Sequence, residues 1–205
     1  HVVGADAPAG GEGVLASAPE LQALGFVLAD FQPCRAAAGK HVEHAVDFLG
    51  HFGAGMARSW NEDEGMISAV FGGIQRDASI IQLLDLRFLT ADDPMFTGTL
   101  EALEKDLRRG NDMLRYSAPD DFGEPVTAFN VCTFWLIEAL HRTGRTEEAR
   151  ELFEEMLSRR TAAGLLSEDI DPHNGELWGN YPQTYSLVGI INCAVMLSKR
   201  WNEFR

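Results

Sequence analysis

Three segments of the chain place their apolar residues on one helical face. Residues 41–59, 95–109 and 146–160 repeat apolar residues at spacings of three and four, as an amphipathic helix requires. We therefore predict three helices that each cover a core with one side only. Their apolar positions are Val42, Ala45, Val46, Leu49, Phe52 and Met56, then Phe96, Leu100, Leu103 and Leu107, then Ala149, Leu152, Phe153, Met156 and Leu157.

Three further segments are apolar almost all round. Residues 77–89, 128–143 and 184–199 have this pattern, which is typical of helices packed on both sides. The two kinds of segment alternate along the chain. The alternation predicts an all-α fold of about three hairpins, each with one outer and one inner helix. Hairpins of this kind build an α/α toroid, in which the inner helices line the axis and the outer helices shield them.

The lengths of the predicted loops differ in a regular way. The connections from inner to outer helices are short, at residues 90–94 and 144–145. The connections from outer to inner helices, at 60–76, 110–127 and 161–183, are long, and long loops in a compact domain are usually functional or disordered. In a toroid all three would emerge at one end, beside the N-termini of the inner helices, where a cleft would lie.

A helical-repeat protein is the competing interpretation of the same pattern. The stretch EALHRTGRTEEARELFEEML is similar to one turn of a tetratricopeptide-type repeat, which would make the chain a protein-interaction module without catalysis. The sequence shows no fixed repeat period, however, and the loops of a solenoid are typically short. We therefore favour the toroid.

Residues 1–39 differ in composition from the rest of the chain. They are rich in Ala and Gly and contain Pro8, Pro19 and Pro33, which predicts a loose N-terminal arm. The first residues lack both an initiator Met and the basic region of a signal peptide, so we expect a processed or incomplete chain rather than a secretory leader.

Charge and cysteine content narrow the classes of partner. The 17 Lys+Arg and 31 Asp+Glu give a net charge of -14, which disfavours nucleic acid and anionic membrane surfaces but not a neutral sugar.

Cys34, Cys132 and Cys193 are odd in number and lack metal-type spacing. Because Cys132 and Cys193 sit in apolar runs, we predict buried free thiols in a reducing compartment, hence a cytoplasmic protein.

The residues best suited to binding or catalysis lie between 164 and 186. This stretch, GLLSEDIDPHNGELWGNYPQTYS, interleaves carboxylates with aromatic rings and amide or hydroxyl donors. Aromatic rings can stack on sugar faces, polar groups can bind hydroxyls, and a carboxylate can move protons at the anomeric carbon, so the stretch predicts a sugar-binding cleft. Its members are Glu168, Asp169, Asp171, Glu176, Trp178, Tyr181, Gln183 and Tyr185.

The order of several motifs resembles the C-terminal half of a glycoside hydrolase family 15 catalytic domain, the group of glucoamylases, glucodextranases and bacterial trehalases. The matching pieces run from about residue 59 to 201, whereas residues 1–50 show no convincing similarity. They are WNEDEGMISAVFGG, DASII, LRY, AFNVCTFWLIEALHRTGRTEEARELFEEML and GLLSEDIDPHNGELWGNYPQTYSLVGIINCA. The resemblance implies that residues 40–205 form half of an (α/α)6 barrel that hydrolyses α-glucosidic bonds with inversion, without a metal or cofactor.

The resemblance also implies roles for individual residues. Glu168 matches the general base, with Asp169 as its nearest competitor, and their adjacent charges could raise the pKa of either group. Arg115 and Tyr116 match an arginine-tyrosine pair that binds sugar, and a guanidinium offers several fixed donors to vicinal hydroxyls. Further candidates for contacts with the sugar or the attacking water are Trp178, Gln183 and Tyr185. Phe129 and Trp135 are interpreted as core residues, and nothing in the sequence decides the role of His173.

One part of the family pattern is missing from the sequence. The general acid of the family lies in a segment resembling DxGIWE, which these residues lack, so we expect the acid upstream of His1 and an isolated chain without activity. Asp120, Asp121 and Glu124 are the nearest substitutes, but they follow Arg115 in the stretch where the family binds substrate. A carbohydrate-binding remnant without catalysis is therefore a further alternative.

A metal site is the last possibility that the sequence raises. His41, His44 and His51 share one face of the first predicted helix, yet no Cys or firm carboxylate partner accompanies them, so we predict no metal. We also expect the apolar faces of an incomplete barrel to allow self-association.

Overall fold

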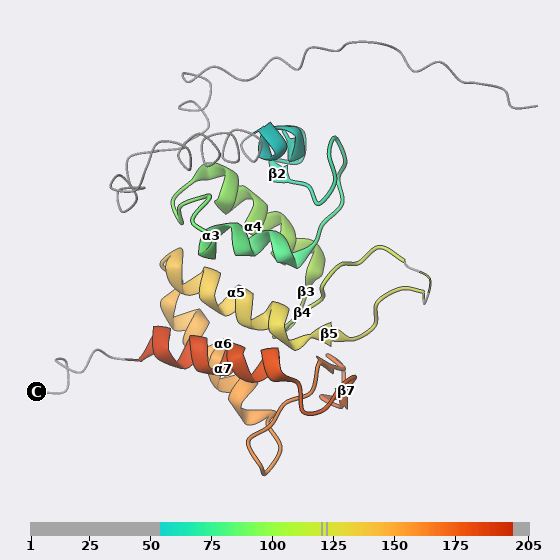
Figure 1. Ribbon diagram of the computed structural model, residues 1–205, viewed down its shortest axis with the longest axis vertical. Coiled ribbons are helices and arrows are strands. Elements are labelled where there is room, and N and C mark those ends of the chain that lie inside the picture. The colour runs from blue at the N-terminus through green and yellow to red at the C-terminus, as the bar shows by residue number, and fades with distance from the viewer. Residues whose placement is uncertain (1–53, 120, 122, 199–205) are drawn as a thin grey trace, which may run out of the picture. The chain divides into compact units, whose positions relative to one another are not determined.

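The structure, a computed structural model, describes residues 54–119, 121 and 123–198 (Figure 1). The chain divides into two units, residues 1–57 and 58–205, and the second unit carries everything discussed below. Residues 54–59 are helical, and the remainder of the predicted helix 41–59 lies outside the described residues. The predicted arm at residues 1–39, the three histidines between 41 and 51, and Cys34 also lie outside them.

The two outer helices within the described residues follow the predicted pattern. Helix α4 spans Pro94–Leu107, begins behind Asp93, whose side chain accepts a hydrogen bond from Met95 N, and buries Phe96, Leu100, Leu103 and Leu107. Helix α6 spans Thr146–Ser158 and buries Ala149, Leu152, Phe153 and Met156. Ion pairs connect the two elements, since Arg108 contacts both Glu104 and Glu148 at 2.8 Å. Both helices therefore bury one face, as predicted.

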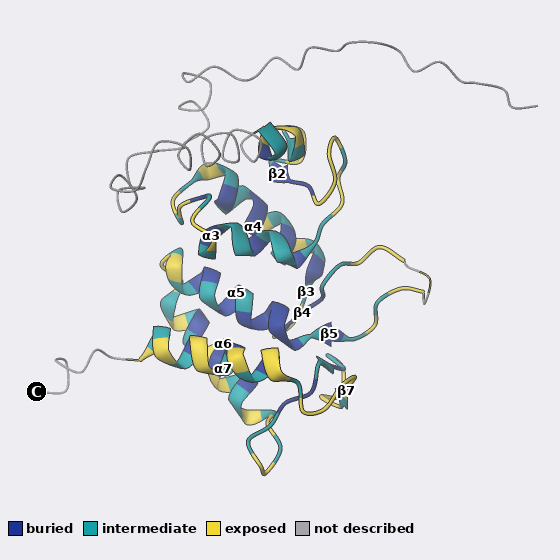
Figure 2. Ribbon diagram, in the orientation of Figure 1, coloured by how far each residue is buried: buried dark blue, intermediate teal, exposed yellow. Residues whose placement is uncertain are grey.

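Helix α5, Asn130–Arg142, is the centre of the second unit. It packs against α6, against α7 and against the short helix η2, and it is buried on almost every side (Figure 2). Two of its residues, Cys132 and Phe134, face neighbours within the core, and Cys132 is a buried free thiol, as is Cys193 of α7. The prediction of a helix at 128–143 that is packed on both sides is confirmed, apart from its first two residues, which form a strand, and Thr143, which caps the helix.

The predicted helix at 77–89 is shorter than expected. A 3-10 helix, η2, covers Ala78–Ile81 and a single helical turn, α3, follows at Gln82–Asp85. Asp77 caps η2 by accepting a hydrogen bond from Ser79 N at 2.8 Å. The chain then turns at Arg87, whose φ of 59° places it in the left-handed region, where a helix cannot continue.

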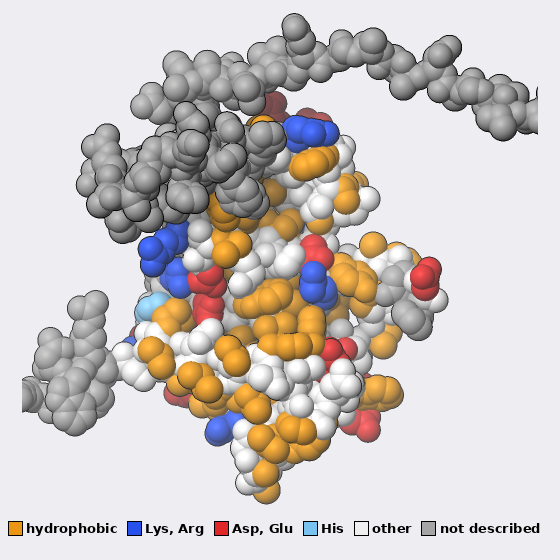
Figure 3. Space-filling view, in the orientation of Figure 1, with side chains coloured by type: hydrophobic (Ala, Val, Ile, Leu, Met, Phe, Trp, Pro, Cys, Tyr) orange, Lys and Arg blue, Asp and Glu red, His pale blue; other side chains and the backbone are white. Residues whose placement is uncertain are grey.

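Helix α7, Thr184–Leu197, is apolar all round but is not buried all round within the described residues. Only Ser186, Gly189 and Cys193 are buried. Val188, Ile191 and Val195 lie one helical turn apart and are 45%, 60% and 74% exposed, and Figures 2 and 3 show this uncovered apolar surface along the helix. The predicted packing on both sides is therefore wrong for α7, because no described element covers its outer face.

Short antiparallel strands organise the three long loops. Strands β1 (Trp60–Asn61) and β2 (Met66–Ile67) form one pair, and β3 (Arg108–Arg109) and β4 (Asp112–Met113) form another. A third sheet joins β5 (Ala128–Phe129), β6 (Asp169–Ile170) and β7 (Leu177–Trp178), with Phe129 opposite Asp169 and Asp169 opposite Trp178. This sheet brings the 161–183 loop to the N-terminus of α5.

Among the described helices, none is long and apolar enough to cross a membrane.

Gly189 allows the close approach of α7 to α5. A Cβ atom at this position would lie 2.4 Å from Cδ2 and 2.9 Å from Cβ of Phe134, so rotating the ring would not relieve the overlap. Gly189→Ala gains about 1 kcal/mol of helix propensity, but overpacking a core costs about 1–3 kcal/mol. We expect a net loss in the free energy of unfolding, measured by denaturant titration. Val188→Ala, an exposed neighbour, should change it by less than about 0.5 kcal/mol, and a more stable Gly189→Ala variant would contradict this packing.

The exposed face of α7 should drive self-association, because contiguous apolar patches on soluble proteins usually mark contacts. We expect the purified 205-residue protein to sediment as a dimer or larger species and to bind an apolar dye. Replacing Ile191 and Val195 together by Lys should shift it towards monomer. Val126, as exposed as Val195 at 74% but in a loop, provides the matched control as Val126→Lys. A wild-type monomer without dye binding would refute this expectation.

Candidate functional site

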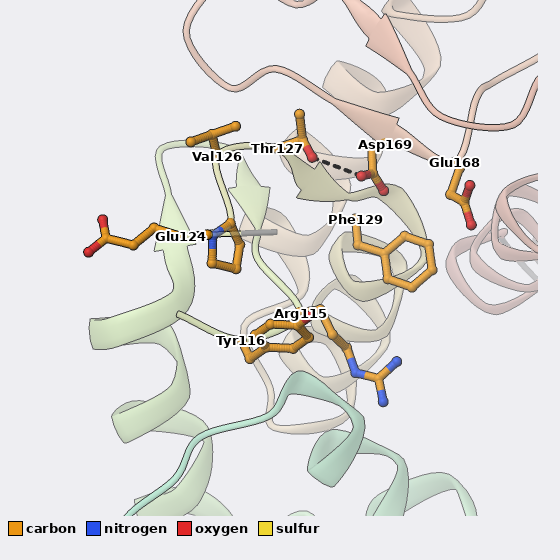
Figure 4. Close-up of a pocket in the computed structure, with 10 residues that line it drawn as sticks. Arg115, Tyr116, Glu124, Val126, Thr127, Phe129, Glu168 and Asp169 are labelled. Carbon is orange, nitrogen blue, oxygen red and sulfur yellow. Dashed lines mark hydrogen bonds between the residues drawn. The ribbon is translucent and has the colours of Figure 1, made fainter. Parts of the chain in front are cut away.

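A cavity of about 530 Å³ lies at the N-terminal end of α5, between the 110–127 loop and strand β6 (Figure 4). Arg115 and Tyr116 line one side, and Phe129, Glu168 and Asp169 line the other. The segment from Gly123 to Thr127 completes the lining. The cavity therefore brings together Arg115 and Tyr116, the predicted sugar-binding pair, with Glu168 and Asp169, the two candidates for the base, from loops that are more than 50 positions apart.

Main-chain hydrogen bonds fix the backbone of Glu168 on both sides. Its carbonyl oxygen accepts from Asn130 N at 3.0 Å, and its own N–H donates to Asn180 O at 2.9 Å. The side chain of Asn130, which is fully buried, donates through Nδ2 to Ser167 O at 2.9 Å. The first residue of α5 thus holds Glu168, which directly precedes β6, in place.

Three donors hold the carboxylate of Glu168. Tyr185 Oη donates to Oε1 at 2.6 Å, while Asn180 donates to Oε2 through its backbone N–H at 3.1 Å and through Nδ2 at 2.7 Å. An ionised carboxylate has about four acceptor positions, and the Gln183 side chain also interacts with this one.

These hydrogen bonds favour the charged form of Glu168. The Tyr185 hydroxyl and the Asn180 backbone N–H lower the pKa of the Glu168 carboxyl, with further contributions from the side chains of Asn180 and Gln183. Partial burial and the same hydrogen bond raise the pKa of Tyr185 to about 12, so its hydroxyl stays protonated as a donor. Glu168 is therefore an ionised carboxylate at neutral pH, as a proton acceptor must be.

Asp169, the competitor for the same role, lies in a different environment. Its Oδ2 accepts a hydrogen bond from Thr127 Oγ1 at 2.8 Å across the β5–β6 pair (Figure 4). Burial raises the pKa of Asp169, and the charge of Glu168 adds to this effect. The expectation that adjacent charges could raise either pKa is thus correct for Asp169 and wrong for Glu168.

Arg115 is oriented by an ion pair with Asp77. Its Nε donates to Asp77 Oδ1 at 2.7 Å, and its carbonyl oxygen accepts from Ala78 N at 2.8 Å. A guanidinium carries five N–H donors, so an ion pair through Nε leaves donor capacity for a ligand. In Figure 4 the guanidinium extends to the side of Phe129 on which Glu168 lies, while Glu124 points to the opposite side.

Three of the aromatic residues named from the sequence lie in different surroundings. Phe129, interpreted as core, lines the cavity and packs edge-on against Tyr185, with ring centroids 5.6 Å apart. Trp135 is half-buried and lines a separate cavity between α3, α5 and α7. Trp178, a predicted sugar contact, is 52% exposed in β7 and does not line the cavity beside Glu168.

The remaining predicted residues take supporting positions. Gln183 precedes α7, where its N–H donates to Leu166 O at 3.0 Å. The Tyr181 hydroxyl interacts with Thr161 Oγ1 at 3.0 Å. His173 is exposed in the β6–β7 hairpin and lines a smaller neighbouring cavity. In the described part of the chain, no cluster of three or more His, Cys, Asp or Glu residues is placed to hold a metal ion.

Two neighbours of the predicted site residues were not identified from the sequence. Asn180 supplies two of the three donors to Glu168, and Asp77 fixes Arg115. Asp77 carried a recognisable signal, since Asp immediately before an apolar run is a typical N-cap. Asn180 carried none, because its role depends on the hairpin that returns the chain to Glu168.

Comparison with known proteins identifies relatives that contain more than this chain. A trehalase from Thermoplasma volcanium is 34% identical over 145 residues, which are 70% of this chain and 23% of that protein. A trehalase from Mycolicibacterium smegmatis is 32% identical over 145 residues, 69% of this chain and 22% of that protein. The chain thus spans about a quarter of the length of these relatives.

Solved structures show the same partial coverage. A wild-type glycosidase aligns with 86% of this chain and 48% of its own at a TM-score of 0.66 and 20% identity, and a variant of it in complex with glucose aligns equally well. This similarity shows the fold alone.

A family model gives the broadest match. The model of glycosyl hydrolases family 15 covers residues 29–195, which extends the similarity well before residue 59, where the motifs begin. It covers α3 to α6 in full and α7 as far as residue 195. The chain therefore belongs to glycosyl hydrolases family 15 and covers part of that family's catalytic domain.

Proposed function

We propose that this chain supplies the general base and part of the sugar-binding surface of an inverting α-glucosidase. The observation that carries the proposal is the carboxylate of Glu168, held ionised by three donors at a cavity that also presents Arg115. Arg115 would bind sugar hydroxyls, and Tyr116 and Phe129 would border the sugar.

The proposed reaction needs one proton acceptor on this side of the sugar. A water attacks the anomeric carbon on the face opposite the leaving oxygen, and Glu168 accepts the proton of that water as the new C–O bond forms. The glycosidic C–O bond breaks, and a general acid protonates the leaving oxygen. An inverting enzyme places the two carboxyl groups about 6.5–9.5 Å apart to leave space for the water.

The general acid is proposed to come from outside these 205 residues. Asp169 accepts a hydrogen bond from Thr127, and Glu124 points away from Glu168 (Figure 4). The half-length alignment with the glycosidase and the uncovered face of α7 support the interpretation that α3 to α7 are part of an (α/α)6 toroid completed by further helices.

The substrate is proposed to be an α-glucoside, and trehalose is the first candidate. The curated relatives above are named trehalases, and a glycosidase of the same fold has been solved with glucose. A neutral disaccharide also suits a chain whose net charge of -14 would repel anionic substrates.

Glu168→Gln in an active enzyme that contains these residues with its general acid tests the role of the base. The amide keeps the shape but cannot accept the proton, so kcat should fall about 10²–10⁴-fold with much less change in substrate binding. As the pH is lowered, the wild-type kcat/KM should stay constant until the pH falls through the lowered pKa of Glu168, and should then decline. Asp169→Asn is the matched control, and the assignment fails if it abolishes turnover while Glu168→Gln does not.

The 205-residue chain alone should not hydrolyse trehalose, maltose or isomaltose, because it supplies a base without an acid. Weak glucose binding should survive and should be lost in Arg115→Ala, as measured by chemical-shift titration. Turnover by the purified chain that disappears in Glu168→Gln would place the acid within these residues and would contradict the proposal.

A further inference from the structure

The turn that follows β7 packs directly against Glu168. Asn180 and Glu168 are joined by three hydrogen bonds, of which two end on Oε2 and one joins the Glu168 N–H to the Asn180 carbonyl oxygen. The pairing is reciprocal, because each residue donates its backbone N–H to the other. Glu168 is therefore tied to this turn by its backbone and by its side chain.

Gly179 shows how closely the turn approaches the carboxylate. A Cβ atom at this position would lie 2.9 Å from Cβ and 3.0 Å from Oε2 of Glu168, and the residue has a φ of +77°. Any L-residue would be strained at this φ and would also press on the Glu168 side chain. The chain thus has a glycine where space beside the carboxylate is smallest.

The side-chain hydrogen bond of Asn180 can be separated from the structure of the turn. The turn is held by the backbone hydrogen bond from Glu168 N to Asn180 O at 2.9 Å, and the β6–β7 hairpin before it is held by its own backbone pairs, such as Asp171 N to Glu176 O at 2.9 Å. The amide of Asn180, by contrast, donates to the carboxylate at 2.7 Å. Removing that amide removes a donor from Glu168 without removing the backbone pairs.

We propose that Asn180, placed by Gly179, is a positioning residue that fixes the Glu168 carboxylate for proton acceptance. The inference rests on the proposed role of Glu168 as the general base. Two N–H groups on Oε2 and the Tyr185 hydroxyl on Oε1 restrict the carboxylate to one orientation. Since near-attack geometry governs the rate of proton transfer to a base, loosening this orientation slows the reaction even though Asn180 touches no reacting atom.

Asn180→Ala and Asn174→Ala form a matched pair for the test. Asn174 lies in the connection between β6 and β7, close before this turn, but its side chain accepts from Glu176 N and has no hydrogen bond to Glu168 in the described structure. The readout is the pKa of Glu168 from a carbon-13 NMR titration of the 205-residue protein. Both variants retain the other charged or titratable groups at the site. These are Arg115, Tyr116, Glu124 and Asp169 in the cavity lining, Tyr185 on the carboxylate and Asp77 paired with Arg115. We expect the pKa of Glu168 to rise in Asn180→Ala and to stay unchanged in Asn174→Ala.

Gly179→Ala and Gly175→Ala form a second pair that does not depend on the amide. Both glycines have nearly the same positive φ, +77° and +76°, but a Cβ at Gly175 meets nothing within 4 Å. The two variants share the backbone strain, so only Gly179→Ala should shift the carboxyl resonance and the pKa of Glu168. An equal response of the two, or an unchanged Glu168 in folded Asn180→Ala, would overturn the inference.

Kinetics of the active enzyme separate this inference from the proposed function. Asn180→Ala should lower kcat with little change in KM, and by less than the ~10²–10⁴-fold loss expected for Glu168→Gln. If Glu168→Gln retained turnover, the proposed function would fail, whatever the titrations show. If Glu168→Gln abolished turnover while Asn180→Ala left both kcat and the pKa of Glu168 unchanged, only the positioning role would fail.

Discussion

The hydrogen bond from Asn130 N to Glu168 O is the contact on which the arrangement of the site depends. It joins the first residue of the most buried helix to the loop that carries the carboxylate, and Asn130 Nδ2 reinforces it at Ser167 O. Because Asn130 is fully buried, losing either bond would leave desolvated polar groups without partners, which is costly. The strand pairing of Phe129 with Asp169 and the return of the chain to Asn180 both extend from this junction.

Periodicity predicted the helices well wherever burial alone determines them. The predicted ranges 95–109 and 146–160 differ from α4 and α6 by one or two residues at the ends, because apolar residues at i, i+3 and i+4 specify a single covered face. The failures lie where another constraint acts. Arg87 ends the segment after α3 with a left-handed φ, and the all-apolar sequence of α7 does not reveal that one side is uncovered in the described structure.

The site was predictable only in part, for a similar reason. Glu168, Arg115 and Tyr116 were found through resemblance to a family, and the structure places them at one cavity. Trp178 was included because it is close in sequence, but the alternation of side chains along β7 and its hairpin leaves the indole largely exposed. Asn180 lies 12 positions from Glu168, and Asp77 lies 38 positions from Arg115. Each pair becomes neighbours only after folding.

Tyr185 connects the carboxylate with the uncovered face of α7. It lies in the first turn of that helix, donates to Glu168 and continues the line of exposed residues formed by Val188, Ile191 and Val195. Any polypeptide that seated on this face would contact the helix that carries the phenol. Binding that changed the hydrogen bond from Tyr185 to Glu168 would be thermodynamically linked to the proton affinity of the carboxylate, and the linkage would act equally in both directions. Ionisation of Glu168 would report on assembly, and assembly would tune its basicity.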